Sequence, residues 1–386
     1  MPALALAHGM AGEPVPPDWP PLTTAEVRRL FARLPDLAEA GDARVRWQSP
    51  RPFSAAALVS AGPWRLLVKR HGAGLRSLAS LEAEHAFMRH LSARGVPVPR
   101  VLEDGRASAW QDGGYVYEVL GAMPGLDLYA DAPSWTPFIS PQHPAAAGAT
   151  LAKLHLASQS YLAPERPVEP LYASARVISS PDPRAGVQAL AQQLAGLARY
   201  LSGRPWREQL AAALAPFHDR FIPHAPSLGE LWAHNDWHPS NLLWSAEGPG
   251  AEVAGVIDFG LANRTSAGYD LATALERSAV GWLEPPARRP VHRAAVRELL
   301  RGYWSVRPLS AGEAAALPHF LPLVHVDYAL SEIDYFWRVV RSPANADLAY
   351  EAYLLGHLHW FAAGEGRRLC SYVAQVLDEL GSGITT

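Results

Sequence analysis

The stretch that decides the fold is His234-Asn235-Asp236-Trp237-His238-Pro239-Ser240-Asn241, which Ile257-Asp258-Phe259-Gly260 follows further along the chain. An Asp that accepts or orients the proton of an attacking hydroxyl is one requirement of phosphoryl transfer. Phosphoryl transfer also requires Mg²⁺ to be held against the phosphates, here by a neutral Asn oxygen and an anionic Asp oxygen. The order of residues therefore predicts Asp236 as the catalytic group and Asn241 and Asp258 as magnesium ligands.

The segment between these two motifs is predicted to be a hairpin. Residues 242–244 and 253–257 are apolar and strand-like, and residues 245–250 are rich in turn formers. Because a hairpin brings its ends together, Asn241 and Asp258 are expected side by side at one mouth. The alternative is that Asp236 caps a turn and Asp258 ends a strand, with no metal between them. The ordered set favours the metal site.

The composition is typical of a soluble enzyme. The 386 residues carry a net charge of −3, and 49% are hydrophobic, so no basic surface indicates a nucleic-acid partner. No stretch of about twenty apolar residues and no secretory signal is found, so we expect no membrane partner and a cytoplasmic location. The single cysteine, Cys370, excludes an intramolecular disulfide framework. Nothing in the sequence indicates the oligomeric state.

Lysine is rare in this chain. Among 34 basic residues only Lys69 and Lys153 are lysines, so a lysine is expected where a compact ammonium is needed. Lys69 ends the strand-like run 64–68 and is predicted to bind nucleotide phosphates as a point charge. Lys153 lies within the helical run 145–157 and is predicted to be a surface residue.

We expect an α+β fold of two lobes preceded by an extension. Residues 1–42 read as a flexible, Pro-rich N-terminal extension with one short helix that begins at the capping box 23–26. Residues 43–120 read as a small β-rich lobe that binds nucleotide. Residues 121–386 read as a larger, mainly helical lobe that carries the catalytic loop and the acceptor site.

Several residues of the small lobe are candidate nucleotide contacts. The loop 49–53 would cover the phosphates; it has no glycine, but Ser49 and Ser54 could contact phosphate and Arg51 could add charge. An ordinary hairpin loop is an equally open interpretation. In the helix 78–93, Glu84 lies at helical spacing from apolar residues, and we expect it, in preference to Glu82, to pair with Lys69.

The strand 115–120 is predicted to lead into a hinge at residues 121–125. Backbone groups at such a strand exit could hydrogen-bond adenine, and Glu118 and Leu120 are the candidate positions.

The ordered set of Lys69, Glu84, the catalytic loop and the segment that begins at Ile257 resembles the aminoglycoside phosphotransferase and choline kinase group of the protein-kinase-like fold. Residues 151–155 and 269–272 add to the resemblance, which covers about residues 43–280. It implies ATP, with GTP as an alternative, held with Mg²⁺. It also implies that Lys69 binds phosphates, that Asp236 serves the acceptor hydroxyl, and that Asn241 and Asp258 bind the metal.

Two further roles follow from the resemblance. His234 and Asp270 look like structural supports of the catalytic loop. Asn235 stands where the group usually has glycine.

The segment from Asp258 to Asp270 is too short for an activation segment that docks a polypeptide, so a small-molecule hydroxyl acceptor, with an amine or a sugar, is favoured. A regulatory protein kinase and a nucleotide-binding pseudokinase are the alternatives.

The acceptor site is predicted less sharply. On the helical run 325–338, Asp327, Glu332 and Asp334 lie near aromatic residues and could receive a cationic amine or a sugar. The alternative is a solvated, salt-bridged helix face. Trp237 either packs in the core or lines the acceptor pocket.

Overall fold

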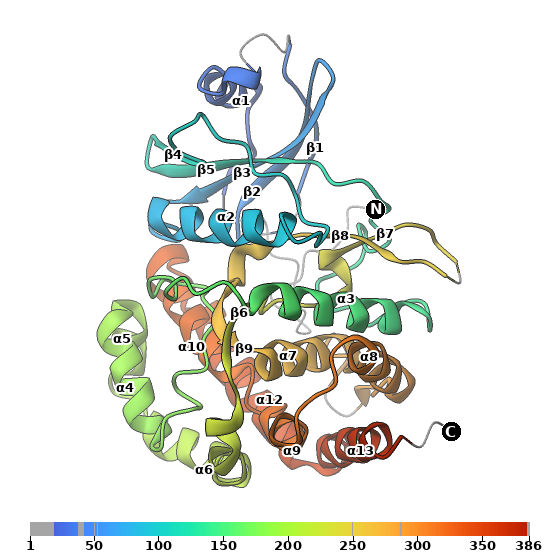
Figure 1. The fold of residues 1–386 in the computed structure, drawn as a ribbon. Helices are drawn as coiled ribbons and strands as arrows, with labels where there is room; N and C mark the ends of the chain where they lie inside the picture. Colours follow the sequence, from blue (N-terminus) through green and yellow to red (C-terminus); the bar gives the residue numbers. More distant parts are fainter. Residues whose placement is uncertain are drawn as a thin grey trace.

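The computed structural model describes residues 19–37, 42–49, 51, 53–248, 250–285 and 288–383. These form an α+β molecule with a small β-rich lobe above a larger helical lobe (Figure 1). The expected flexible segment of the N-terminal extension falls mostly on residues 1–18, which lie outside the described residues. The last strand of the small lobe ends at Gly121, and the division into residues 43–120 and 121–386 stays a prediction.

The small lobe is built on one antiparallel sheet with the strand order β1-β2-β3-β5-β4. Val59, Val68 and Val119 are buried on this sheet, as expected of β-branched residues on a pleated surface. The strands are β1 (Arg44–Gln48), β2 (Ala55–Ala61), β3 (Trp64–Gly72), β4 (Ala109–Asp112) and β5 (Tyr115–Gly121).

Two helices pack on the small lobe. Helix α1 (Thr24–Phe31) begins at the predicted capping box, in which Thr23 and Glu26 satisfy each other's backbone amides. Helix α2 (Leu78–Ser92) is capped by Ser77 and buries one face that includes Phe87 and Leu91.

Two short antiparallel ribbons are separate from the sheet of the small lobe. Strands β7 (Leu242–Trp244) and β8 (Val253–Val256) form the predicted hairpin, and β6 (Glu230–Ala233) pairs with β9 (Asn263–Ser266). The Ile257 amide donates to the Asn241 carbonyl at 3.0 Å. Asn241 and Asp258 therefore lie together at the mouth of the hairpin, as predicted.

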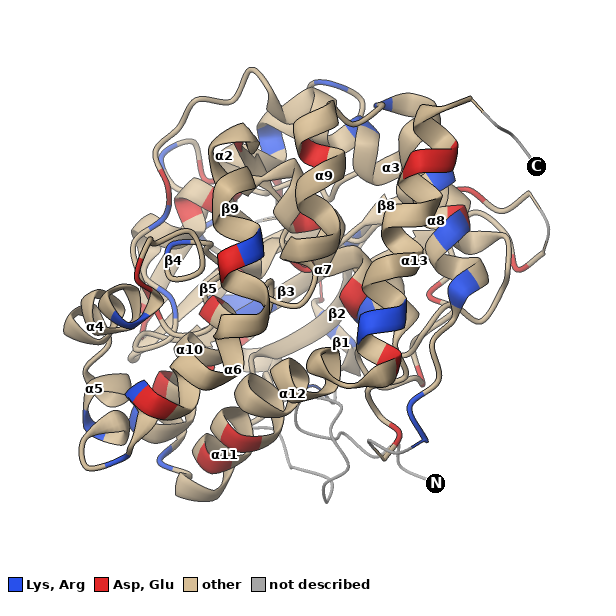
Figure 2. Cartoon of the chain, turned by 90° about the horizontal axis from the view of Figure 1, so that it is seen from below, with Lys and Arg blue, Asp and Glu red and all other residues tan. Residues whose placement is uncertain are grey.

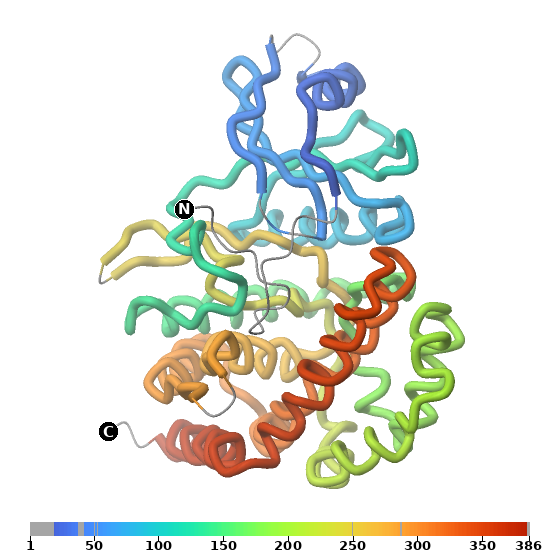
Figure 3. The backbone as a smooth tube through the Cα atoms, turned by 180° about the vertical axis from the view of Figure 1, so that it is seen from behind, coloured from blue at the N-terminus to red at the C-terminus, as the bar shows by residue number. Residues whose placement is uncertain are grey.

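The large lobe is mainly helical, and its final helices run along one side of it (Figure 3). Basic and acidic residues are interspersed over the helices seen from below (Figure 2). The helices are α3 (His143–Ser158), α4 (Pro183–Gln193), α5 (Ala195–Leu201), α6 (Trp206–Phe221), α7 (Ala267–Ala279), α8 (Arg293–Val306), α9 (Ala311–Phe320), α10 (Val326–Asp334), α11 (Pro343–Leu348), α12 (Gly356–Ala362) and α13 (Gly364–Gly381).

Short helical turns complete the lobes. The π-helical segments η7 (Tyr335–Val340) and η8 (Ala349–Leu355) follow α10 and α11, and 3₁₀ turns include η2 (Pro35–Leu37), η3 (Ile222–Ser227), η4 (Pro239–Asn241) and η5 (Phe259–Leu261). Over the described ranges, no helix combines the length and apolarity that crossing a membrane requires.

Helices α3 and α8 approach closely through two glycines. A Cβ atom at Gly148 would collide with the Leu299 carbonyl, and one at Gly302 would collide with the Ala145 carbonyl. Both obstacles are backbone atoms of the opposite helix, so neither can rotate away. Glycine at these positions therefore sets the spacing of the two helices.

We predict that Gly148→Ala lowers the free energy of unfolding by about 1–3 kcal/mol, because the added methyl group forces the two helices apart. Gly229→Ala is the matched control, since a Cβ atom there meets nothing within 4 Å. Urea unfolding of both variants is the measurement. Equal stability of the two variants would show that α3 and α8 move apart freely.

Candidate active site

The predicted metal ligand Asp258 lies at the junction of the lobes. Its side chain is 45% exposed, and its Oδ1 atom lies 3.0 Å from the Nζ atom of the buried Lys69. Burial favours the neutral carboxyl, but the charges of Lys69 and Arg51 outweigh burial and hold the pKa of Asp258 well below its usual value. Asp258 is therefore an anionic group that is partly accessible to solvent.

Asp258 also has a constrained backbone. Its φ angle is +62°, in the left-handed region that few residues other than glycine adopt. Such strain at a polar residue accompanies functional sites more often than ordinary turns. The conformation fixes the direction in which the carboxylate points.

The partner predicted for Lys69 is wrong. Lys69 pairs with Asp258, whereas the Oε2 atom of Glu84 lies 3.6 Å from the Nη2 atom of Arg166. Burial lowers the pKa of Lys69, and the charges of Asp258, Glu118 and Glu84, in that order, more than offset it and raise the pKa. Glu84 is thus close enough to act on the ammonium but is not its ion-pair partner.

Glu118 and Leu120 lie inside the sheet, which corrects the predicted hinge contacts. Glu118 is paired with Lys69 on β3 and with Ala109 on β4. Leu120 lies between β3 and an isolated bridge to Val101. Their backbone groups therefore face neighbouring strands and are not available to a nucleotide base.

The Glu118 side chain is part of a buried hydrogen-bond network. Its two oxygens lie 3.0 Å from His71 Nε2 and 2.9 Å from His85 Nε2. Burial would raise the pKa of Glu118, but the hydrogen bonds from His71 and His85 lower it well below its usual value. Glu118 therefore keeps its negative charge on the strand next to Lys69.

The loop after β1 reaches toward the large lobe through Arg51. The Ser49 amide donates to Ala56 at 2.8 Å, and the Ser49 hydroxyl accepts from the Arg51 amide at 3.2 Å. The Arg51 guanidinium contacts the Ser134 hydroxyl. Burial lowers the pKa of Arg51 and the Asp258 charge opposes this, so the two groups lie near each other. Ser54 is half-buried just before β2.

The catalytic-loop residue Asp236 is held by three neighbours. The Asn241 side-chain amide donates to Asp236 Oδ2 at 3.1 Å and to its carbonyl at 2.9 Å. His238 Nε2 lies 3.4 Å from Oδ1, and the Arg277 guanidinium contacts that same oxygen. Burial lowers the pKa of His238 to about 3, so the imidazole is neutral. Asp236 and the predicted metal ligand Asn241 are therefore direct neighbours.

The buried carboxylate of Asp270 fixes the start of the catalytic loop. It accepts hydrogen bonds from the backbone amides of His234 at 2.8 Å and Asn235 at 2.9 Å. His155 Nε2 lies 3.1 Å from it. His234 in turn reaches the Ile257 carbonyl at 3.0 Å. These contacts give His234 and Asp270 the geometry of supporting residues.

The backbone conformation of Asn235 explains why Asn can stand at a position that is usually glycine. Its φ angle is +62°, a conformation that Asn adopts more readily than most residues. Its side-chain amide donates to the carbonyls of Leu261 at 3.1 Å and Asn263 at 3.2 Å, and Thr265 donates to its oxygen at 2.7 Å. The Asn side chain thus joins the catalytic loop to the segment after Asp258.

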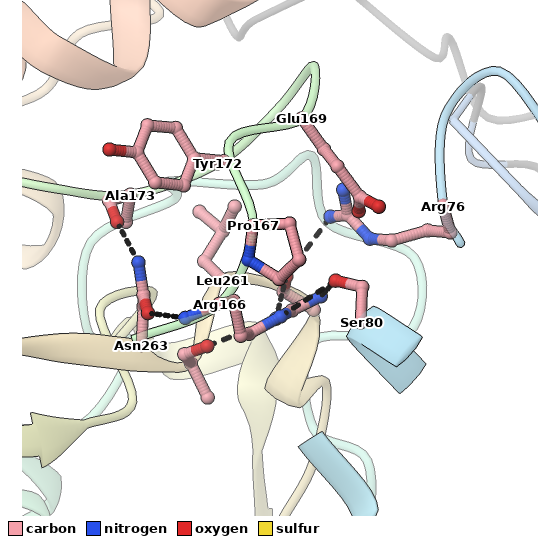
Figure 4. A pocket seen from close by; sticks show the side chains of 11 residues that line it. Arg76, Ser80, Arg166, Pro167, Glu169, Tyr172, Ala173, Leu261 and Asn263 are labelled. Atoms are coloured by element: carbon pink, nitrogen blue, oxygen red, sulfur yellow. Dashed lines mark hydrogen bonds between the residues drawn. The ribbon is translucent and has the colours of Figure 1, made fainter. Parts of the chain in front are cut away.

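Two buried arginines that the sequence did not single out hold the segment after Asp258 (Figure 4). Arg76 and Arg166 donate to the Gly260 carbonyl at 3.0 and 2.9 Å. Arg166 also donates to Ala262 at 3.0 Å and to Ser80 on α2 at 2.7 Å. Helix α2 and the Asp258 loop are therefore fixed to each other.

We predict that Arg166→Lys lowers the free energy of unfolding by about 2–4 kcal/mol, because an ammonium cannot satisfy these carbonyls and hydroxyl together. Arg176→Lys is the control, since Arg176 makes an ion pair with Glu165 and is 48% exposed. If the two variants behave alike in chemical denaturation, Arg166 does not fix the loop.

The predicted acceptor residues Asp327 and Asp334 are structural. Asp327 accepts from the Ser174 hydroxyl at 2.6 Å and from the Val177 amide at 3.0 Å. Asp334 accepts from the Gly196 amide at 2.7 Å. Every residue of α10 is buried. Acceptor binding and a solvated helix face are therefore both wrong, although the expected salt bridge is present, because Asp334 pairs with Arg338 at 3.1 Å.

Trp237 and Glu332 are buried as well. Trp237 has no exposed surface and packs edge-on against His234, so it supports the loop from within the core. Glu332 has no exposed surface either and lies beside Tyr328, whose pKa is raised by burial and by the Glu332 charge.

Arg277 is a third arginine of the site that the sequence analysis missed. It lies on α7 two helical turns after Asp270, hence on the same helix face. The seven-residue spacing from Asp270 was the one feature of the sequence that could have identified Arg277. The residue type could not, because arginine is the ordinary cation of this chain.

Comparison with known proteins identifies the class to which this fold and site belong. The sequence model of the phosphotransferase enzyme family matches residues 50–309. The chain belongs to that family and is a small-molecule phosphotransferase. Its fold is protein-kinase-like, as expected.

Individual relatives are distant. The homoserine kinase of Methylobacillus flagellatus is 27% identical over 289 residues, which cover 70% of this chain and 74% of that protein. The homoserine kinase of Acidiphilium cryptum is 29% identical over 269 residues, which cover 67% of this chain and 70% of that protein. Among solved structures, a microcompartment-associated aminopropanol kinase superposes with a TM-score of 0.56 at 18% identity, covering 92% of this chain and 100% of that one.

Proposed function

We propose that this protein is an ATP- and Mg²⁺-dependent kinase that phosphorylates a hydroxyl group of a small amine-bearing acceptor. The observation that carries the proposal is the convergence of four predicted groups. Lys69 lies 3.0 Å from Asp258, and Asn241 lies 3.1 Å from Asp236. GTP remains an alternative nucleotide.

The donor set fits Mg²⁺ bound together with nucleotide. Within the described ranges, no group of three His, Cys, Asp or Glu is arranged to hold a metal ion by itself. The oxygens of Asn241 and Asp258 would hold the ion, and phosphates and waters would complete its coordination, as is usual for Mg²⁺. The bound ion would offset the negative charge of the phosphates.

The other groups have separate tasks in this proposal. Lys69 binds and orients the phosphates from the small lobe, and Arg51 adds positive charge near Asp258. Asp236 orients the acceptor hydroxyl toward the phosphorus and accepts its proton. The supports of the catalytic loop hold Asp236 in place while the nucleotide and acceptor bind.

The acceptor class follows from the relatives and from one spacing. The named relatives include homoserine kinases and an aminopropanol kinase, which suggests a small amino alcohol. The short segment between Asp258 and Asp270 disfavours the alternative, a regulatory protein kinase. Retention of all four polar groups disfavours a pseudokinase.

We predict that two isosteric variants separate chemistry from metal binding. Asp236→Asn should keep Mg²⁺-dependent ATP affinity within a few-fold while transfer falls by about 10²-fold or more, since it removes the proton acceptor. Asp258→Asn should weaken Mg²⁺-dependent nucleotide binding itself. Calorimetric nucleotide titration beside acceptor-dependent turnover is the measurement.

Each variant can contradict the proposal. If Asp236→Asn loses nucleotide binding while remaining folded, Asp236 belongs to the metal site. If Asp258→Asn turns over normally at ordinary Mg²⁺ concentrations, the metal assignment is wrong.

The two lysines provide a second, internally controlled prediction. Lys69→Arg should lower turnover by about 10²-fold, because a guanidinium is larger and planar and cannot take the place of a buried ammonium between phosphates and Asp258. Lys153→Arg should have no effect, since Lys153 is exposed on α3. Steady-state turnover of both variants decides. Full activity of Lys69→Arg would remove Lys69 from the phosphate site.

A further inference from the structure

Arg277 places a buried cation directly against Asp236. Its side chain is 4% exposed, and its guanidinium contacts the same oxygen of Asp236 that lies nearest to His238. The guanidinium carbon lies 5.3 Å from the centre of the Trp135 ring and 5.4 Å from that of Tyr328. Two aromatic walls therefore hold a buried positive charge against the proposed catalytic carboxylate.

This contact opposes catalysis unless something changes it. A carboxylate paired with a guanidinium is stabilised as an anion and is a weaker proton acceptor. The guanidinium also covers the oxygen that would face an acceptor hydroxyl. In the structure, Arg277 occupies the Oδ1 atom of Asp236. A ligand that attracts Arg277 would free this oxygen for the acceptor hydroxyl.

Beyond Arg277, the same aromatic walls carry buried polar atoms that have no hydrogen-bond partner in the described part of the protein. These are Tyr353 Oη, His325 Nδ1 and His357 Nε2. The Tyr353 ring lies 5.3 Å from Trp135, 5.4 Å from His325 and 4.8 Å from His357. Buried polar atoms are normally satisfied, so this group indicates a place where a polar ligand binds.

Arg277 supplies the positive charge of this group toward Asp236. Burial lowers the pKa of His325 to about 4 and lowers that of His357 as well, so both imidazoles are neutral. Glu276 lies 3.0 Å from His357, and burial raises its pKa to about 8, so it is largely neutral at pH 7. The guanidinium carbon of Arg289 lies 5.0 Å from the centre of the Trp282 ring, and its charge acts on both Glu276 and His357.

We propose that Arg277 binds a carboxylate of the acceptor, so that the acceptor is a small hydroxy acid, such as a hydroxylated amino acid. The inference rests on the proposed function and names its substrate class. The acceptor carboxylate takes the guanidinium from Asp236, and Asp236 is then free to accept the proton of the acceptor hydroxyl.

A carboxylate fits this position better than a phosphate. A guanidinium matches the two oxygens of a carboxylate with two parallel hydrogen bonds, and one cation offsets one negative charge. A phosphate dianion would place two negative charges beside Asp236, where, among the described residues, Arg277 is the cationic side chain in contact with that carboxylate.

The test uses acceptors that differ only in the carboxylate. L-Homoserine is paired with 3-aminopropan-1-ol, and L-threonine with 1-aminopropan-2-ol. For at least one pair, the wild-type protein should show kcat/KM higher for the carboxylated member by about 10²-fold, the scale of a buried charge-assisted hydrogen bond. This comparison needs no variant.

Variants then locate the preference. Arg277→Gln should reduce the ratio between pair members toward one, chiefly through KM of the carboxylated acceptor, and Arg277→Lys should keep part of it. Tyr353→Phe should leave stability unchanged, because it removes an unpartnered hydroxyl, yet raise that same KM. Arg204→Gln is the control, since Arg204 stacks on Tyr200 at 4.1 Å and pairs with Asp347.

The outcomes separate the inference from the proposed function. If the wild-type protein transfers phosphate faster to the acceptors without a carboxylate, the inference about Arg277 is wrong, but the protein is still a kinase. Equal loss for both members in folded, nucleotide-binding Arg277→Gln also overturns it, because Arg277 would then act only through Asp236. Absence of transfer to any hydroxyl compound overturns the proposed function, and the inference with it.

Discussion

The ion pair between Lys69 and Asp258 is the interaction on which the site depends. It joins the central strand of the small lobe to the end of the β7–β8 hairpin, across the junction of the lobes. Burying the Lys69 ammonium costs solvation free energy. The negative charges of several carboxylates, rather than one, offset this cost. Arg76 and Arg166 then fix the following backbone through the Gly260 carbonyl. Nucleotide phosphates would therefore meet a cation and an anion that are already in place.

A second constraint acts on the catalytic loop. Asp270 uses both carboxylate oxygens to hold the backbone where Asn235 adopts a left-handed conformation. That strain is offset by the Asn235 side chain, whose hydrogen bonds lead to the segment after Asp258. The loop that carries Asp236 and the loop that carries Asp258 are thus one hydrogen-bonded unit. Arg277 contacts this unit from α7 through Asp236.

Local patterns in the sequence predicted the local structure. Turn formers between apolar runs gave the hairpin, the capping box gave the start of α1, and the scarcity of lysine pointed to Lys69. Long-range partners were not predictable in the same way. Helical spacing showed that Glu84 faces inward, but it could not choose between Lys69 and Arg166, which come from distant parts of the chain. Asp327 and Asp334 look like surface charges until the backbone amides they accept from, at Val177 and Gly196, are brought to them by the fold.

A crystal structure with Mn²⁺ and a non-hydrolysable ATP analogue would locate the metal by anomalous scattering, without assumptions about its ligands. We expect a metal peak about 2.1 Å from the side-chain oxygens of Asn241 and Asp258, as for Mg²⁺ in such sites. We also expect Lys69 Nζ within hydrogen-bond distance of a phosphate oxygen, and Asp236 outside the coordination sphere. A metal held by Asp236, or a nucleotide bound away from Lys69, would show that these residues do not have the proposed roles.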